Sequence, residues 1–308
     1  MLEKKELRLL ELLDTSKKRQ EVLDQLEYAP QSVTNAATKL ETIGLLRRER
    51  EAGATVFVPT DTRCGELFQS LVKGKPHVDF PELLSPAVRE LLYYLPPGDG
   101  RLAAELTDDV SYSRATVYRK LKTLTNRAIV GKEHDRYRLL DEFSELHEFV
   151  RELRHQHHRT RVRDDLDGGT LLWESYDEFL ARSEAPVEEP PYRRTGLDAF
   201  AEYGLEFFTP SGYYYFYAEP DRELSPADLA CHLLLIENDS RHRKYALLLI
   251  ARTDESPETV RAAASHYGVV EAMEPLLESL ETGGRSNAAE APSWDEMQSL
   301  ADEYGVTL

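Results

Sequence analysis

One pattern occurs twice in the first half of the chain and limits what that half can fold into. In each copy, an amphipathic helix with a polar outer face leads into two short strand-forming stretches separated by a tight polar turn. The helices are expected over residues 31–42 and 113–124, and the hairpins that follow them over residues 45–60 and 128–140. A small helix-and-hairpin domain that is present twice and is followed by a module of helices and strands predicts the α+β class for the chain.

The first copy begins with two further helices, expected over residues 3–14 and 16–26, the second with Ser16 as its N-cap. Gly44 is placed to end the third helix in a left-handed conformation, which glycine adopts without steric cost. Polar side chains on the outer face of that helix, and arginines in the hairpin, have the size and chemistry to reach base edges and phosphates. The DNA-binding candidates of this copy are Gln31, Ser32, Thr34, Asn35, Lys39, Arg47, Arg48 and Arg50.

The run Leu40-Glu41-Thr42-Ile43-Gly44-Leu45, followed by a basic hairpin and a closing Thr60, resembles the winged helix-turn-helix domains of the MarR and ArsR classes. The resemblance implies a domain that binds double-stranded DNA through its third helix and its hairpin wing. The alternative is a three-helix domain whose hairpin contacts a protein.

In the second copy, Ser85-Pro86 begins a helix that runs to Leu95, and a short helix is expected over residues 101–107. Ser113 is the expected N-cap of the third helix. The positions of that helix expected to face the core are Ala115, Val117, Leu121 and Leu124. Its first nine residues, Ser-Arg-Ala-Thr-Val-Tyr-Arg-Lys-Leu, resemble the recognition helices of bacterial and archaeal regulators. The DNA-binding candidates of this copy are Ser113, Arg114, Thr116, Tyr118, Arg119, Lys122, Lys132 and Arg136.

Two such units in one chain imitate the two-fold arrangement of dimeric regulators, which place two helices in successive major grooves about 34 Å apart. The second copy is the stronger candidate, because four cations lie between Arg114 and Lys122 and the corresponding helix of the first copy has only Lys39. Either both copies contact DNA, or one of them is purely structural.

Charge is divided unevenly along the chain. Residues 1–163 contain 28 Lys and Arg against 26 Asp and Glu, whereas residues 164–308 contain 10 against 30. Because DNA is a polyanion, we expect it to be bound by the first part and repelled by the second. The scattered acidic residues, and the excess of 27 Arg over 11 Lys, also resemble the composition of haloarchaeal proteins, whose surface carboxylates keep them soluble in concentrated salt.

The domains expected from these patterns are two winged helix-turn-helix domains, over residues 1–78 and 79–163, and an acidic α/β domain over residues 164–308. The second of these includes a basic helix after Asp141 that could follow a phosphate backbone or form a solvated dimer contact. In the third, strands are expected over 170–176, 206–208 and 212–217, a helix over 176–183, an extended loop over 185–191, helices over 197–203, 227–237, 257–265, 269–281 and 294–304, and a buried strand or helix over 243–253.

The sequence contains no motif that indicates catalysis. It has no Ser/His/Asp or Cys/His elbow, no glycine-rich phosphate loop and no His-Glu-x-x-His, so we expect no enzyme activity, no catalytic residue and no cofactor. His155 and His158 are the one histidine pair of the basic helix at a metal-binding spacing, and a solvated face or a phosphate contact is favoured over a metal. Cys64 and Cys231 are expected as buried thiols. With no membrane-spanning run and no signal peptide, a cytoplasmic protein is expected.

The runs 224–232, 245–251, 266–268 and 274–280 resemble the C-terminal region of the AbiEi family of antitoxins and regulators. That resemblance implies an antitoxin that regulates its own operon and neutralises a nucleotidyltransferase-like toxin. Our leading hypothesis from the sequence is a DNA-binding transcriptional regulator whose acidic domain binds a protein partner or a small effector. The antitoxin is the alternative, and homodimer formation is left open.

Overall fold

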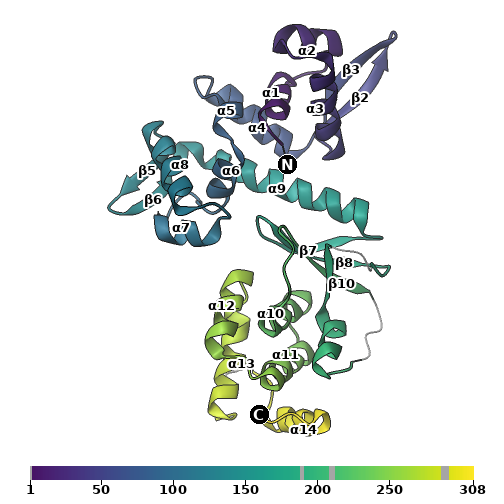
Figure 1. The fold of residues 1–308 in the computed structure, drawn as a ribbon, viewed down its shortest axis with the longest axis vertical. Helices are drawn as coiled ribbons and strands as arrows, with labels where there is room; N and C mark the ends of the chain where they lie inside the picture. The colour runs from purple at the N-terminus through teal and green to yellow at the C-terminus, as the bar shows by residue number, and fades with distance from the viewer. Residues whose placement is uncertain (1, 188–190, 208–211, 286–290) are drawn as a thin grey trace. The chain divides into compact units, whose positions relative to one another are not determined.

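The computed structural model describes residues 2–187, 191–207, 212–285 and 291–308. The chain divides into two compact units, Met1–Thr160 and Arg161–Leu308 (Figure 1). Within the described ranges, no helix is both long and apolar enough to cross a membrane. The fold combines many helices with small antiparallel sheets, as the predicted α+β class requires.

In the first unit, one order of elements occurs twice: helix, short strand, helix, helix and a two-stranded hairpin. We call the two copies the first repeat (α1 to β3) and the second repeat (α6 to β6). In each, the short strand pairs with the second strand of the hairpin, which gives the sheet orders β1-β3-β2 and β4-β6-β5. The first repeat consists of α1 (Lys4–Leu12), β1 (Lys17–Lys18), α2 (Arg19–Leu26), α3 (Pro30–Thr42), β2 (Leu46–Glu51) and β3 (Ala54–Pro59).

The second repeat is preceded by α4 (Arg63–Gly74) and α5 (Phe80–Leu83). It consists of α6 (Pro86–Tyr93), β4 (Arg101–Leu102), α7 (Ala103–Asp109), α8 (Arg114–Asn126), β5 (Val130–Glu133) and β6 (Arg136–Leu139).

The sequence patterns did not predict the two short strands β1 and β4. Helices were expected from residues 16 and 101, but Lys17–Lys18 and Arg101–Leu102 are extended and pair with β3 and β6. Ser16 is therefore not an N-cap, and α2 begins after Lys18. Two residues have no detectable periodicity of their own, and only the distant hairpin strand gives them a partner.

A single hydrophobic core connects both repeats. It is completed by α9 (Ser144–Asp165), which follows a short 3-10 turn (Asp141–Phe143). Phe149 of α9 lies against Phe68 of α4, with ring centroids 5.0 Å apart. Gln156 donates a hydrogen bond of 2.7 Å to the Ile43 carbonyl, at the end of α3. The two repeats therefore share one hydrophobic core and form a single folded body.

The solvated basic face expected on α9 is present only in part: Arg151 and Arg159 are exposed, but other basic residues of the helix are not. Arg154 and His158 are only 7% and 3% exposed. Burial, with smaller contributions from nearby positive groups, lowers the pKa of His157 to about 3. Arg154, His157 and His158 therefore lie on the side of α9 that is covered by protein.

The second unit contains a four-stranded antiparallel sheet of order β7-β8-β10-β9. A helix was expected over residues 176–183, but residues 178–183 form a strand, β8, with Phe179, Leu180 and Ala181 buried in succession. A short apolar run is compatible with a helix or a strand. It forms a strand here because it pairs with one neighbouring strand on each side. The strands are β7 (Thr170–Glu174), β8 (Glu178–Ser183), β9 (Tyr192–Thr195) and β10 (Tyr213–Ala218).

Helices make up the rest of the second unit. The segment expected as a buried strand or helix is the helix α11, and the residues expected to be helical over 197–203 form a 3-10 turn, Gly196–Tyr203. Of the strand expected at 206–208, Glu206 and Phe207 are not in a strand, and Phe208 lies outside the described residues. The helices are α10 (Pro226–Ile236), α11 (Ser240–Thr253), α12 (Pro257–Tyr267), α13 (Val270–Thr282) and α14 (Trp294–Tyr304).

Candidate nucleic-acid interface

The helix α8 presents a basic outer face. Its first turn is capped by Ser113, whose hydroxyl accepts a hydrogen bond from the Thr116 N–H at 3.4 Å. Val117, Leu121 and Leu124 are buried as expected. Ala115 is exposed, contrary to expectation, because the first turn extends beyond the core. The predicted residues that this face brings together are Ser113, Arg114, Tyr118, Arg119 and Lys122, with Thr116 half-buried beside them.

Two cations of this face keep their charge available. In the described part of the chain, Arg119 and Lys122 have no ion pair. Arg114 lies over the ring of Tyr118, 5.4 Å from its centroid, and Tyr118 is 40% exposed. The fourth cation, Lys120, turns inward and donates to the Ser85 hydroxyl at 3.0 Å. The outer face of α8 therefore combines positive charge with one exposed aromatic ring.

The hairpin of the second repeat holds its cations more tightly. Lys132 lies 3.6 Å from Asp135, and 5.3 Å from the centre of the Tyr137 ring. Arg136 donates to the Gly100 carbonyl at 2.6 Å and lies 3.9 Å from Glu105. Both side chains are exposed, but part of their charge and hydrogen-bonding capacity is already used.

The corresponding helix α3 of the first repeat is close to neutral. Its cation Lys39 forms a 3.2 Å ion pair with Glu6, a carboxylate residue that is only 4% exposed. Gln31 donates to Asn35 at 2.9 Å. Of the other candidates on this helix, Thr34 donates to the Pro30 carbonyl at 3.0 Å, and Ser32 is half-buried.

The first hairpin alternates basic and acidic residues. Arg48 is held by Glu41 through its Nε at 2.8 Å, and Arg47 lies 2.8 Å from Glu49. Hydrogen bonding to Arg48 holds the pKa of Glu41 below its ordinary value, against the opposing effect of burial. Arg50 is exposed and has no ion pair within the described residues. All three arginines were equal candidates from the sequence, because it does not reveal that Arg48 pairs with Glu41 of α3 or that Arg47 pairs with Glu49 of its own strand.

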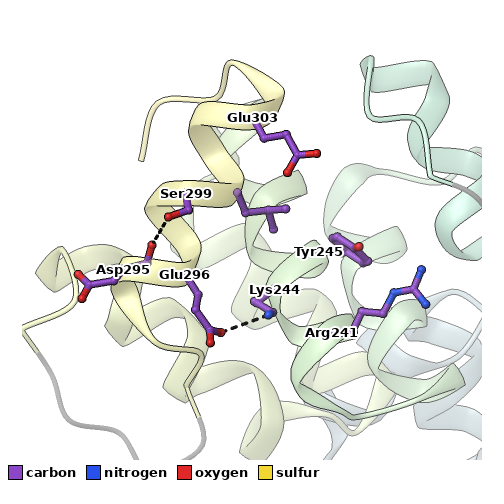
Figure 2. Close-up of a pocket in the computed structure, with 8 residues that line it drawn as sticks. Arg241, Lys244, Tyr245, Asp295, Glu296, Ser299 and Glu303 are labelled. Carbon is purple, nitrogen blue, oxygen red and sulfur yellow. Dashed lines mark hydrogen bonds and ion pairs between the residues drawn. The ribbon is translucent and has the colours of Figure 1, made fainter.

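The second unit contains a cleft between α11 and α14 (Figure 2). Its volume is about 550 Å³. The side chains that line it are Arg241, Lys244, Tyr245, Asp295, Glu296, Ser299, Leu300 and Glu303. Sequence reasoning did not single out these residues, because the two helices that carry them, Ser240–Thr253 and Trp294–Tyr304, are separated by 40 residues of chain.

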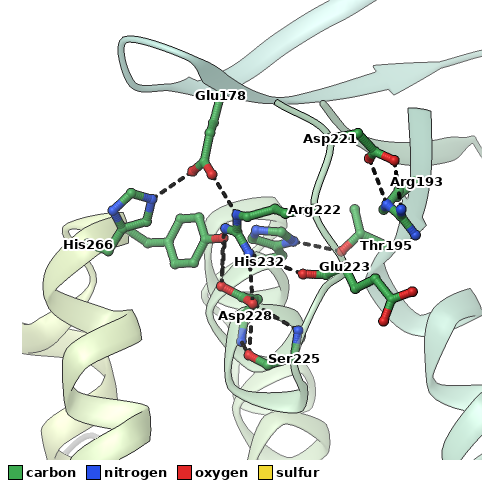
Figure 3. A network of polar contacts seen from close by, with 11 residues as sticks. Glu178, Arg193, Thr195, Asp221, Arg222, Glu223, Ser225, Asp228, His232 and His266 are labelled. Atoms are coloured by element: carbon green, nitrogen blue, oxygen red, sulfur yellow. Dashed lines mark hydrogen bonds and ion pairs between the residues drawn. The ribbon is translucent and has the colours of Figure 1, made fainter. Parts of the chain in front are cut away.

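A polar network connects the sheet of this unit to its helices (Figure 3). Arg222 donates to Glu178 at 2.6 Å, to Asp228 at 3.1 Å and to the Tyr267 hydroxyl at 2.8 Å. Tyr267 donates in turn to Asp228 at 2.9 Å, and His266 lies 2.7 Å from Glu178. Each carboxylate thus has a cation and further hydrogen bonds, which makes the network a means of holding four segments together.

Burial and pairing shift the pKa values in this network. Burial alone would raise the pKa of Asp228, but hydrogen bonds from Arg222 and Ser225 hold it below the usual range. The same opposition, with His266 and Arg222 as the donors, lowers the pKa of Glu178. His232 is fully buried, which lowers its pKa to about 3, and its Nδ1 lies 2.8 Å from the Thr195 hydroxyl. At neutral pH, the ionised carboxylates of Glu178 and Asp228 pair with Arg222, beside the neutral imidazole of His232.

Within the described residues, Glu237, Asp239 and His242 are the group of potential metal ligands whose donor atoms come together, within 4.8 Å. Asp239 caps α11 by accepting the His242 N–H at 2.7 Å, and its carboxylate also lies 2.7 Å from His242 Nδ1. The N-cap of α11 and the Asp239–His242 contact therefore explain why these donor atoms lie close together. Cys64 and Cys231 are buried free thiols, as expected, and burial raises the pKa of both.

Comparison with known proteins gives one finding for the second unit. Residues 189–306 match the family model described as HVO_2833_C, C-terminal, a haloarchaeal family of unknown function. The search of the curated proteins found no match. The haloarchaeal family agrees with the acidic, arginine-rich composition of the chain.

Proposed function

We propose that this protein is a sequence-specific, double-stranded-DNA-binding transcriptional regulator, in which both repeats are winged helix-turn-helix domains. The proposal draws on the element order of each repeat, in which a third helix precedes a hairpin that would act as the wing. The antitoxin-like alternative stays a prediction from the sequence, since the matching family brings no function with it. The proposal includes no catalytic step.

The observation that carries the proposal is the outer face of α8. Arg119 and Lys122 are exposed and unneutralised within the described residues, and Arg114 adds a guanidinium braced by Tyr118. A helix that enters the major groove needs such groups, because arginine binds guanine edges and phosphates in bidentate fashion and lysine binds phosphates. We therefore assign the main reading role to α8 and an auxiliary, phosphate-contacting role to the first repeat.

The proposal is tested by fluorescence anisotropy with labelled DNA from immediately upstream of the protein's own gene. A scrambled duplex of the same length and base composition is the matched control, and both are titrated over a series of KCl concentrations. Affinity for both duplexes should fall with salt, because counterions are released from the phosphates. The upstream duplex should keep an advantage of at least about tenfold, which corresponds to one good base contact. Equal affinity for both duplexes at every salt concentration would contradict sequence-specific recognition.

A second arm uses the fragment 1–160, which has 26 basic and 26 acidic residues and ends at the boundary between the units. It should bind the upstream duplex at least as tightly as the full chain, because it lacks the acidic second unit, which repels phosphate. DNA binding by the fragment 161–308 alone would overturn the assignment.

A further inference from the structure

The two walls of the cleft between α11 and α14 have opposite charge (Figure 2). The wall from α11 provides Arg241 and Lys244, and the wall from α14 provides Asp295, Glu296 and Glu303. One pair crosses the cleft, with Lys244 Nζ 3.2 Å from a carboxylate oxygen of Glu296. Opposite charges on separate walls favour a ligand that itself carries both signs.

Two further charges of the cleft, Arg241 and Glu303, are not used in ion pairs among the described residues. The guanidinium of Arg241 lies over the Tyr245 ring, 5.5 Å from its centroid, so its orientation is supported while its N–H groups stay available. An arginine of this kind suits a carboxylate, since the guanidinium donates two parallel hydrogen bonds.

Two apolar side chains also line the cleft. Tyr245 and Leu300 line it, and both are half-buried. Tyr245 packs on Phe207 with ring centroids 4.1 Å apart, and Phe207 packs on Tyr304 at 5.2 Å. These ring contacts support Tyr245 from behind, so less conformational freedom is lost when a ligand packs on it.

We propose that this cleft binds a short peptide with free termini and apolar side chains. Arg241 takes the C-terminal carboxylate, Glu303 takes the N-terminal ammonium group, and the side chains cover Tyr245 and Leu300. An extended peptide advances about 3.3–3.6 Å per residue, so the two charged termini of a dipeptide or tripeptide lie about 7–11 Å apart. The volume of about 550 Å³ holds a ligand of this size. The site is independent of the proposed DNA-binding function, and its test contains no DNA.

Isothermal titration calorimetry on the full chain tests the proposal with the tripeptide Leu-Ala-Leu as the probe. The same peptide is used with its N-terminus acetylated or with its C-terminus amidated, so that each loses one charge. We expect the free peptide to bind at least about tenfold more tightly than either blocked form, the effect of losing one charge-assisted hydrogen bond. Free L-leucine should bind more weakly than the tripeptide, since it cannot span both charges.

Matched variants identify which wall binds which terminus. In Arg241→Gln, the free and amidated peptides should bind equally, and in Glu303→Gln, the free and acetylated peptides should bind equally. The control is Arg261→Gln, which replaces a half-buried arginine of α12 that pairs with Glu274. This variant should bind all probes as the unaltered chain does. Circular dichroism melting curves check that each variant is folded.

Three outcomes would overturn the proposal: no heat from the free tripeptide at millimolar concentration, binding by both variants as tight as that of the unaltered chain, or L-leucine binding as tightly as the tripeptide. Absence of DNA binding by the protein would leave this result unaffected, so the two proposals fail separately.

Discussion

At the scale of the residue, the two repeats differ in what already neutralises their cations. Lys39 is paired with the buried carboxylate of Glu6, whereas Arg119 has no ion pair in the described part of the chain. A cation that must first leave a carboxylate contributes less to phosphate or base binding than one that is free. We therefore expect the two repeats to contribute unequally to DNA binding, although their sequence patterns are similar.

Replacing Arg119 by Ala should therefore weaken binding to the upstream duplex by at least about tenfold, as one lost bidentate contact costs about 1–3 kcal/mol. Arg114→Ala should act in the same direction. Lys39→Ala should change the affinity by less than about threefold, because the pair with Glu6 already limits what this residue gives to DNA. Anisotropy titrations on the three variants, at a temperature where melting curves show each to be folded, measure the order. A loss from Lys39→Ala that equals the loss from Arg119→Ala would show that α3 binds DNA as strongly as α8.

The buried histidine of the second unit predicts a dependence of stability on pH. His232 has a folded-state pKa below its unfolded value of about 6.5, because burial disfavours the charged form. Its neutral form therefore contributes stability above pH 6.5, and this contribution is lost as the pH falls below that value. The free energy of unfolding should fall by up to about 1.4 kcal/mol per pH unit from this one group.

Both tryptophans, Trp173 and Trp294, lie in the second unit, so their fluorescence reports its unfolding in urea. The double variant His232→Phe with Thr195→Val removes the imidazole together with the hydroxyl that pairs with it. Its free energy of unfolding should change less between pH 7 and pH 5 than that of the unaltered chain. An identical slope in both proteins would show that His232 does not titrate in this way.

At the scale of the element, the first turn of α8 is expected to affect both the stability of the protein and its affinity for DNA. Ser113 caps the helix through its hydroxyl and lies on the face assigned to DNA. Asp is as good an N-cap as Ser and favours the positive end of the helix dipole, but it adds a negative charge that phosphates repel. The two contributions of this position can therefore be separated by substitution.

Ser113→Ala should lower the free energy of unfolding by about 1 kcal/mol, the usual cost of losing a cap, and should affect DNA affinity only weakly. Ser113→Asp should keep the stability within about 0.5 kcal/mol and reduce DNA affinity at least tenfold at low salt, an effect that fades as KCl is raised. Urea unfolding measures the stability of each variant, and anisotropy measures its affinity for DNA. Unchanged DNA binding in Ser113→Asp would place this end of α8 away from the phosphates.

At the scale of the whole molecule, α9 contributes to both units. Its residues up to Thr160 belong to the first unit, while Val162 and Leu166 pack in a small core with Phe179, Ala181 and Tyr215 of the second. The boundary expected at residue 163 would remove Val162 from that core. A fragment of the second unit should therefore begin at Arg161.

The fragment 161–308 contains 12 basic and 30 acidic residues, so carboxylate repulsion opposes its folding at low salt. We expect its melting temperature, followed by circular dichroism, to rise with KCl up to molar concentrations, because salt shortens the Debye length to about 3 Å. The fragment 1–160, with equal numbers of basic and acidic residues, is the control and should rise less. Equal responses of the two fragments would remove the halophilic explanation of the charge.

Much of the first unit was readable from local sequence. The spacing of apolar residues predicted α3 and α8, Gly44 takes the predicted left-handed conformation with φ of +75°, and Ser113 is the predicted cap. The outer faces of these helices, and with them the candidate DNA-binding residues, followed from the same periodicity. Their role in binding DNA stays a prediction.

Features that depend on neighbours within one or two helical turns therefore followed from the sequence in part. The extents of α3 and α8, the Ser113 cap, the Gly44 turn and the division of charge were predicted, whereas Ser16 was wrongly predicted to be a cap. The tertiary structure alone decided that residues 178–183 form a strand, that Lys39 is neutralised by a residue 33 positions earlier, and that Arg222 joins Glu178 to Asp228 and Tyr267. Strand pairing and ion pairing are made with partners far away in the chain. Their energies are set by distance and burial in the folded molecule, which no local pattern of residues specifies.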